Sequence, residues 1–186
     1  MSEAFAWAGM ACASGGVAGS GQIPLDWQWT SFADLRSADL YALLQLRSAV
    51  FVVEQACVFQ DMDGFDAQAM HLLGFAGESG AGLASGSAKQ PHRPLLAYAR
   101  CFPAGFKFSE ASIGRVLTAP VARGTGLGHA LMQRAIQAVH AQWGAQPIRI
   151  GAQAHLADFY AAHGFVDQGR PYLEDGIAHL EMLRTP

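Results

Sequence analysis

The chain has few charged residues and no excess of basic ones. Charged residues make up 15% of its 186 residues and hydrophobic residues 51%, and the formal net charge is −3. A general nucleic-acid binder or membrane-surface binder normally presents a basic face, so we expect neither nucleic acid nor a membrane as a partner. The high hydrophobic fraction excludes a disordered chain and predicts a compact globular protein.

Cysteines and long apolar runs are also scarce. Cys12, Cys57 and Cys101 have neither metal-like nor redox-like spacing, which favours reduced thiols in a cytoplasmic protein. No apolar run reaches the roughly 18 residues needed to span a bilayer. The N-terminus lacks basic residues ahead of an apolar stretch, so we expect no secretory signal.

Two segments are rich in Ala, Gly and Ser and have no apolar period. Residues 1–22 are expected to form a flexible tail, and residues from about 77 to 94 a mobile insertion. The chain length favours a single domain over residues 23–186.

The remaining residues divide into clear elements, and we expect Ser37 to cap the first helix. Trp27 and Trp29 lie on the first strand, expected at a sheet edge; they leave a homodimer surface open, although buried packing is the preferred interpretation. The order of elements predicts an α/β or α+β layer arrangement, with helices on both faces of one mixed sheet. Predicted strands span 25–32, 71–76, 95–101, 112–118, 147–153, 166–169 and 177–183, and predicted helices span 38–54, the glycine turn to about 143, and 156–163.

The most informative segment is a β-branched strand that runs into a glycine-rich turn and continues as a helix. Gly124, Gly126 and Gly128 let consecutive backbone N–H groups crowd around one point, because no Cβ blocks the approach. The helix N-terminus adds unsatisfied donors and the positive end of the macrodipole. This combination predicts an anion cradle, most often for a phosphate, with Arg123 at its mouth.

Two common phosphate-binding folds do not fit this segment. A dinucleotide fold has its glycines after the first strand and an acidic ribose ligand about 20 residues further on, and positions 142–146 hold no acid. A nucleotide-binding P-loop needs a Lys-Ser/Thr pair, which does not follow Gly128.

The spacing Arg123-x-x-Gly126-x-Gly128 before an amphipathic helix resembles the acyl-CoA loop of the GNAT superfamily, the GCN5-related N-acetyltransferases. Pro120 stands where that pattern expects it, and the Phe-Tyr-Ala-Ala-His-Gly-Phe run at 159–165 resembles the family's Phe-Tyr-x-x-x-Gly-Phe signature. Segments at 40–47, 50–55, 61–64, 150–156 and 174–179 resemble the ElaA-type branch, so the resemblance covers roughly residues 25 to 183. It implies the GNAT acyl-CoA N-acyltransferase fold, with a central mixed six- to seven-stranded sheet and helices on both faces, over residues 23–186.

The resemblance implies acetyl-CoA as the acyl donor. The pyrophosphate would lie against the glycine turn, and the pantetheine arm would pair with the backbone of the strand at Val116–Thr118 in the manner of an added strand. Gln153 stands where many members carry a CoA-contacting Asn. A splay between the strand at Val116–Thr118 and the strand at 147–153 would make room for the thioester. The implied cofactor-binding residues are Val116, Leu117, Thr118, Arg123, Gly124, Thr125, Gly126, Leu127, Gly128, His129 and Gln153.

Acetyl transfer to an amine also needs a base, an oxyanion donor and a proton for the leaving thiolate. The resemblance gives Tyr160 the role of general acid, and a backbone N–H near Leu117 could stabilise the oxyanion. Glu54 is the candidate base, because partial burial beside an apolar run would raise its pKa. Glu54 could instead orient the amine or simply end a helix, and His71, His155 and His179 remain other candidates.

An acidic cluster, Asp61-x-Asp63-Gly64-x-Asp66, invites a metal site. A calcium loop needs its glycine after the third acid and a Glu at position 12, so we expect no metal here. We expect instead a negative lining for the acceptor groove, with a solvated loop as the alternative. Together the candidate acceptor-binding residues are Glu54, Asp63, His71, Glu174 and Asp175.

The expected activity is transfer of the acetyl group of acetyl-CoA to a primary amine of a small molecule or peptide, by direct attack in a ternary complex. Residues 46–54 also resemble the start of acyl-homoserine-lactone synthases, which leaves a longer acyl-CoA or an acyl carrier as donor open. A non-catalytic acyl-CoA-binding sensor is the alternative from another class.

Overall fold

The computed structural model describes residues 24–77 and 93–186. The tail predicted at 1–22 lies outside the described residues, as does almost all of the insertion predicted at about 77–94. No helix in the described ranges is long and apolar enough to cross a membrane.

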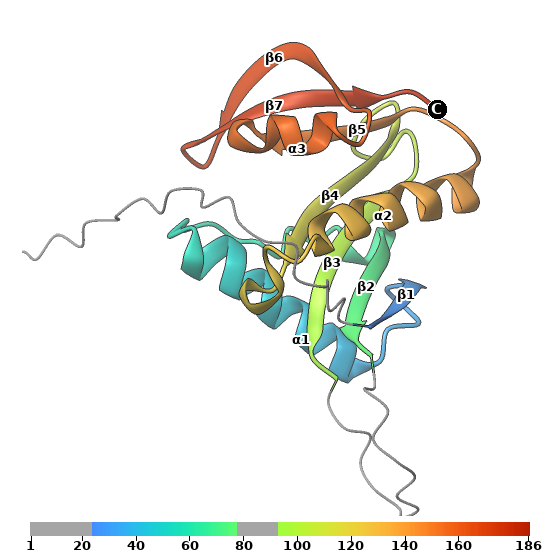
Figure 1. The fold of residues 1–186 in the computed structure, drawn as a ribbon, viewed down its shortest axis with the longest axis vertical. Helices are drawn as coiled ribbons and strands as arrows, with labels where there is room; N and C mark the ends of the chain where they lie inside the picture. Colours follow the sequence, from blue (N-terminus) through green and yellow to red (C-terminus); the bar gives the residue numbers. More distant parts are fainter. Residues whose placement is uncertain (1–23, 78–92) are drawn as a thin grey trace, which may run out of the picture.

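A mixed seven-stranded sheet organises the fold (Figure 1), as the sequence predicts. The strand order is β1-β2-β3-β4-β5-β7-β6, with a parallel pair only between β4 and β5. The strands are β1 (Leu25–Ser31), β2 (Met70–Ala76), β3 (Leu95–Phe102), β4 (Ala111–Thr118), β5 (Ile148–Gln153), β6 (Val166–Glu174) and β7 (Ile177–Arg184).

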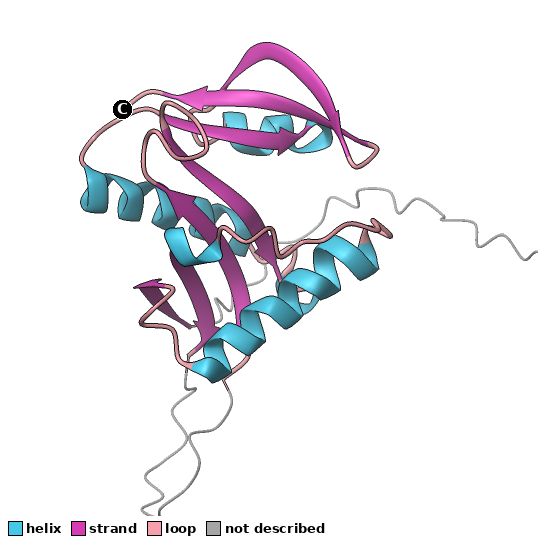
Figure 2. Ribbon diagram, turned by 180° about the vertical axis from the view of Figure 1, so that it is seen from behind, coloured by secondary structure: helices cyan, strands magenta, loops and turns pink. Residues whose placement is uncertain are grey.

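Helices cover both faces of the sheet (Figures 1 and 2). On one face, α1 (Ser37–Arg47) packs Leu43 into a cluster with Leu73 and Tyr98. On the other, α2 (Leu127–Trp143) packs Leu131 and Met132 into the larger cluster. A short α3 (Ala157–Ala161) follows β5. The central strand β3 is buried along its whole length because helices cover both of its faces.

Three local predictions need correction. The first helix begins at Ser37 itself, with Arg36 at the cap position and no side-chain cap, so Ser37 does not cap it. Its predicted last turns, at Ser48–Glu54, form a π-helix, a wider turn that often occurs at functional sites. Strand β6 continues to Glu174 rather than 169, although its side chains are mostly exposed, because hydrogen bonds to β7 rather than an apolar pattern define it.

The two tryptophans of the edge strand pack inside the protomer. Both Trp27 and Trp29 lie against the larger core cluster. The Trp29 ring meets Trp143 edge-on at 6.2 Å between centroids, and its Nε1 donates to the Gln142 side chain at 3.3 Å. A Cβ at Gly74 would lie 2.8 Å from the Trp27 ring, so glycine there makes room for the indole. Core packing accounts for both residues.

Candidate active site

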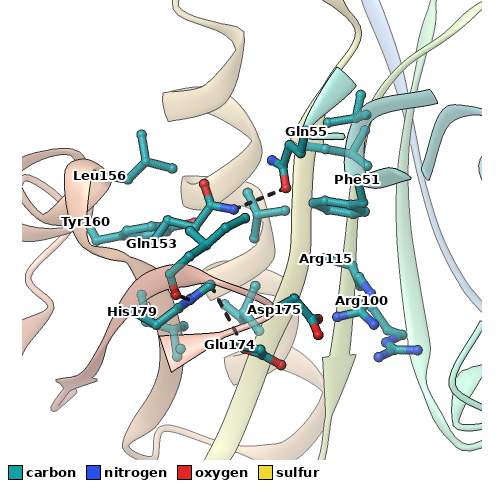
Figure 3. Close-up of a pocket in the computed structure, with 18 of the residues that line it drawn as sticks. Phe51, Gln55, Arg100, Arg115, Gln153, Leu156, Tyr160, Glu174, Asp175 and His179 are labelled. Carbon is teal, nitrogen blue, oxygen red and sulfur yellow. Dashed lines mark hydrogen bonds and ion pairs between the residues drawn. The ribbon is translucent and has the colours of Figure 1, made fainter. Parts of the chain in front are cut away.

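The predicted splay between β4 and β5 is present at the centre of the sheet. The two strands pair only at Ala111 with Ile148 and at Ser112 with Arg149. Beyond Ser112 they diverge, and a cavity of about 580 Å³ opens between them (Figure 3). The end of the π-helix and the turn between β6 and β7 complete its walls.

A bulge in β4 lies at this opening. Tyr98 of β3 pairs with Leu117 of β4, and Arg100 pairs with Gly114. One residue of β3 and two residues of β4 lie between these pairs, so β4 carries one extra residue. Arg115 takes the strained part, with a φ of 50° that non-glycine residues rarely adopt. Such a bulge bends the strand and redirects its side chains.

The glycine turn has the backbone geometry of an anion cradle. Gly124 and Gly126 have φ angles of 75° and 82°, which favour glycine, and Gly126 is the N-cap residue of α2. Within the described residues, no backbone hydrogen bond uses the N–H groups from Gly124 to Gly128. The Thr125 hydroxyl donates to the Ala122 carbonyl at 2.8 Å and braces the turn.

Arg123 is held by Glu54 rather than standing alone at the mouth of the cradle. Its Nη1 and Nη2 donate to the two Glu54 carboxylate oxygens at 2.7 and 2.8 Å. The bond from Arg123 lowers the pKa of the Glu54 carboxyl. The prediction that burial raises this pKa is wrong, because Glu54 is 42% exposed and faces a guanidinium. Glu54 therefore lacks the basicity expected of a general base.

Tyr160 lies on α3 with its side chain against the cavity. The residue is 7% exposed, and burial raises the pKa of its phenol to about 12. The rings of Phe159 and Phe165 contact it edge-on. The hydroxyl therefore stays protonated at neutral pH and can donate a proton or a hydrogen bond into the cavity.

Gln153 ends β5 and reaches across the cleft, where its Nε2 donates to the Gln55 Oε1 at 3.3 Å (Figure 3). His129 instead shares a hydrogen bond of 2.9 Å with the His163 ring. Of the predicted cofactor-binding residues, the cavity is lined by Val116, Leu117, Thr118, Arg123, Gly128 and Gln153, but not by Gly124, Thr125, Gly126, Leu127 or His129.

The acidic cluster does not give the cavity a negative lining. Asp61 bonds Arg47 and Arg115, and Asp63 bonds Arg100. Burial would raise the pKa of Asp63, but the bonds from Arg100 and from the Phe65 N–H hold it well below its usual range. We therefore do not retain Asp63 as an acceptor-binding residue, since it pairs with Arg100 and does not line the cavity.

His71, a candidate base and acceptor-binding residue from the sequence, lies away from the cavity. Its side chain is fully buried and does not line the cavity. Burial lowers its pKa and keeps the ring neutral, so Nε2 donates to the Asp66 carbonyl at 3.0 Å and Nδ1 accepts from the Tyr98 hydroxyl at 2.8 Å. We do not retain His71 as base or acceptor ligand.

The remaining candidates come from the turn between β6 and β7, from β7 and from the segment after β5. Glu174 and Asp175 line the cavity, as do His155 and His179. Asp175 has a φ of 49°, another strained backbone position at the site. His179 is 9% exposed and stacks on Tyr172.

Sequence reasoning missed the cations of the cavity wall. Arg100, Lys107 and Arg115 all line it. A spaced set of basic residues gives no local signal, because their carboxylate partners lie 34 to 54 residues away along the chain. The positive φ at Arg115 has no signature in sequence either, since glycine is the residue that normally reports such a turn.

Solved structures of acyl-CoA N-acyltransferases share the overall fold of this chain. The family model for the acetyltransferase (GNAT) domain matches residues 104–185. A crystal structure of an acyl-CoA N-acyltransferase from Pseudomonas aeruginosa is similar with a TM-score of 0.72 and 41% identity, covering 86% of this chain and 99% of that one. The fold is thus that of the GNAT acyl-CoA N-acyltransferases.

Protein ElaA of Escherichia coli strain K12 is 38% identical over 162 residues, covering 86% of this chain and 96% of ElaA. Its crystal structure has a TM-score of 0.72 to this chain, covering 87% of this chain and 99% of that one. A CoA-dependent acyl-homoserine lactone synthase, at 16% identity and a TM-score of 0.63, shares the fold alone. The chain belongs to the GNAT superfamily, in its ElaA-type branch.

Proposed function

We propose that this protein transfers the acetyl group of acetyl-CoA to a primary amine of a small molecule or peptide, by direct attack in a ternary complex. The amine nitrogen forms a bond to the thioester carbonyl carbon, and the bond from that carbon to sulfur breaks. One proton leaves the nitrogen and one reaches the sulfur, so the products are an amide and free CoA.

The splay of β4 from β5 is the observation that carries this proposal. It opens a cavity lined by Tyr160 and by Arg123 and Gly128, the two ends of the glycine turn whose N–H groups suit a diphosphate. The β4 backbone at Val116, Leu117 and Thr118 does not pair with β5, so it offers an edge to the amide-rich pantetheine arm. With its high pKa, Tyr160 supplies the proton for the departing thiolate.

The function is tested by free-thiol release from acetyl-CoA with a panel of amines, alongside calorimetric titration with CoA. An N-acetyltransferase binds CoA and releases thiol only when an amine is present. Binding without release from any amine contradicts the transfer reaction and supports a non-catalytic sensor. Faster release from long-chain acyl-CoA thioesters than from acetyl-CoA contradicts the acetyl donor and keeps the acyltransferase.

The ion pair between Glu54 and Arg123 gives a prediction about CoA affinity. The diphosphate and the Glu54 carboxylate compete for the same guanidinium, and the two anions repel each other. Glu54→Gln removes the competitor, so we expect CoA to bind about 2- to 5-fold more tightly, the effect of one exposed ion pair. Isothermal titration calorimetry measures the change.

Glu110→Gln is the matched control, because Glu110 is also held by an arginine, Arg149, but does not line the cavity. Its CoA affinity is expected to equal that of the wild type. Weaker binding by Glu54→Gln would contradict the competition and show that the carboxylate orients Arg123 for the diphosphate.

A further inference from the structure

The side of the cavity next to β3 and β4 is lined by cationic side chains, whereas the carboxylates that pair with them do not line the cavity. Arg100, Lys107 and Arg115 line the cavity, whereas Asp61, Asp63 and Asp66 do not. With Arg47, four cationic side chains share these three carboxylates. The cluster therefore carries one positive charge more than its own anions balance.

Among the described residues, the hydrogen bonds of the cluster leave two of its donor nitrogens without a partner. Arg47, which is fully buried, uses Nε and both Nη atoms on Asp61 and Asp66. Arg100 is 3% exposed, yet its buried Nε has no partner. Within the described residues, Arg115 uses Nε and Nη2 on Asp61 but no hydrogen bond uses its Nη1. A buried donor without a partner costs free energy unless a ligand satisfies it.

Arg115 is also fixed in position more tightly than a surface arginine. It sits at the strained residue of the β4 bulge, and strained backbone of this kind clusters at functional sites. Its guanidinium lies 5.8 Å from the ring centroids of both Phe51 and Phe59. A planar, oriented guanidinium with free donors suits a carboxylate, whose two oxygens match its fork.

The turn between β6 and β7 brings side chains of the opposite charge to the same cavity. Glu174 and Asp175 come from the turn between β6 and β7, while Arg100 and Arg115 come from the strand side of the pocket (Figure 3). No ion pair joins these two groups in the described part of the chain. One cavity is thus lined both by cationic side chains and by carboxylates that do not pair with them.

We propose that the acceptor amine also carries a carboxylate, as in a free amino acid; this inference rests on the proposed function. Arg115, backed by Arg100 and Lys107, binds the carboxylate, and Glu174 and Asp175 attract the ammonium group before it loses its proton. The single excess charge of the cluster matches a carboxylate rather than a phosphate, which carries about −1.5 to −2 at neutral pH. A peptide N-terminus or a polyamine has no such group beside its amine.

The test compares acceptors that differ only in the carboxylate. Free-thiol release from acetyl-CoA is measured with α-, β- and γ-amino acids, with their carboxamides and with the corresponding amines that lack the carboxyl group. We expect at least one amino acid to exceed its carboxamide about 10- to 100-fold in kcat/KM, as for loss of a hydrogen-bonded charge. This comparison needs no variant and does not depend on how a variant folds.

Arg115→Gln assigns the preference to a residue. The ratio of kcat/KM for acid over amide is expected to fall about 10-fold or more, with CoA affinity measured by calorimetry to show that the donor site is intact. Arg149→Gln is the matched control, because Arg149 is likewise held by two carboxylates, Glu110 and Glu181, but does not line the cavity. It is expected to keep the wild-type ratio.

Each outcome separates this inference from the proposed function. Turnover of amines with no preference for a carboxylate overturns the inference and leaves the acetyltransferase standing. An unchanged acid-to-amide ratio in Arg115→Gln overturns the assignment to this side of the cavity. CoA binding without thiol release from any amine overturns both.

Discussion

Tyr160→Phe is expected to slow turnover by about 10²- to 10⁴-fold, the range for loss of a general acid. The CoA thiolate then has to leave without a proton from the enzyme. The ring itself remains, so packing against Phe159 and Phe165 and the affinity for CoA are expected to stay unchanged. Steady-state thiol release gives kcat, and calorimetry gives the CoA affinity.

Tyr41→Phe is the control for removing a phenol oxygen elsewhere, because Tyr41 is 70% exposed on α1 and outside the cavity lining. It is expected to keep wild-type kcat. A Tyr160→Phe enzyme with undiminished kcat would contradict the acid role and point to solvent as the proton source.

Arg47→Met is expected to lower the free energy of unfolding by about 3 kcal/mol, the lower end of the range for breaking a buried ion pair. Arg47 is fully buried and bonds Asp61 and Asp66, which are themselves largely buried. The lower end applies because Arg115 still pairs with Asp61, and Arg100 with Asp66. For a protein of this size the melting temperature falls by roughly 6–12 °C, which thermal unfolding followed by circular dichroism measures.

Arg170→Met provides the comparison at the surface. Arg170 is 70% exposed and lies 3.6 Å from Glu181, so its loss is expected to cost no more than about 1 kcal/mol. Equal melting temperatures for Arg47→Met and the wild type would contradict the view that this cluster holds α1, β3 and β4 together.

Most elements of the fold could be predicted because their signals are local. Short, mostly apolar runs mark β2, β3, β4 and β7, and the prediction that α2 ends at about Trp143 is confirmed. The predicted ends of the elements are wrong where the local sequence pattern is weak. In β6 hydrogen bonds replace apolar periodicity, and at the end of α1 β-branched residues continue as a π-helix.

The candidate site was predictable only in part. The glycine turn could be located because a run of glycines before a helix constrains its own backbone. The partners of the charged groups could not, because they depend on which strands become neighbours. Glu54 meets Arg123 across 69 residues of sequence, and that contact reverses the expected direction of its pKa shift.

By itself, the sequence determined where the strands, helices and glycine cradle lie, since these depend on torsion preferences and periodicity within a few residues. Only the tertiary structure decided what the charges do. Asp63 and His71 form hydrogen bonds inside the protein, and Glu54 pairs with Arg123. Arg115, at a strained backbone position, lines the cavity. The physical reason is that electrostatic energy depends on distance and burial in the folded chain, which residue order does not specify.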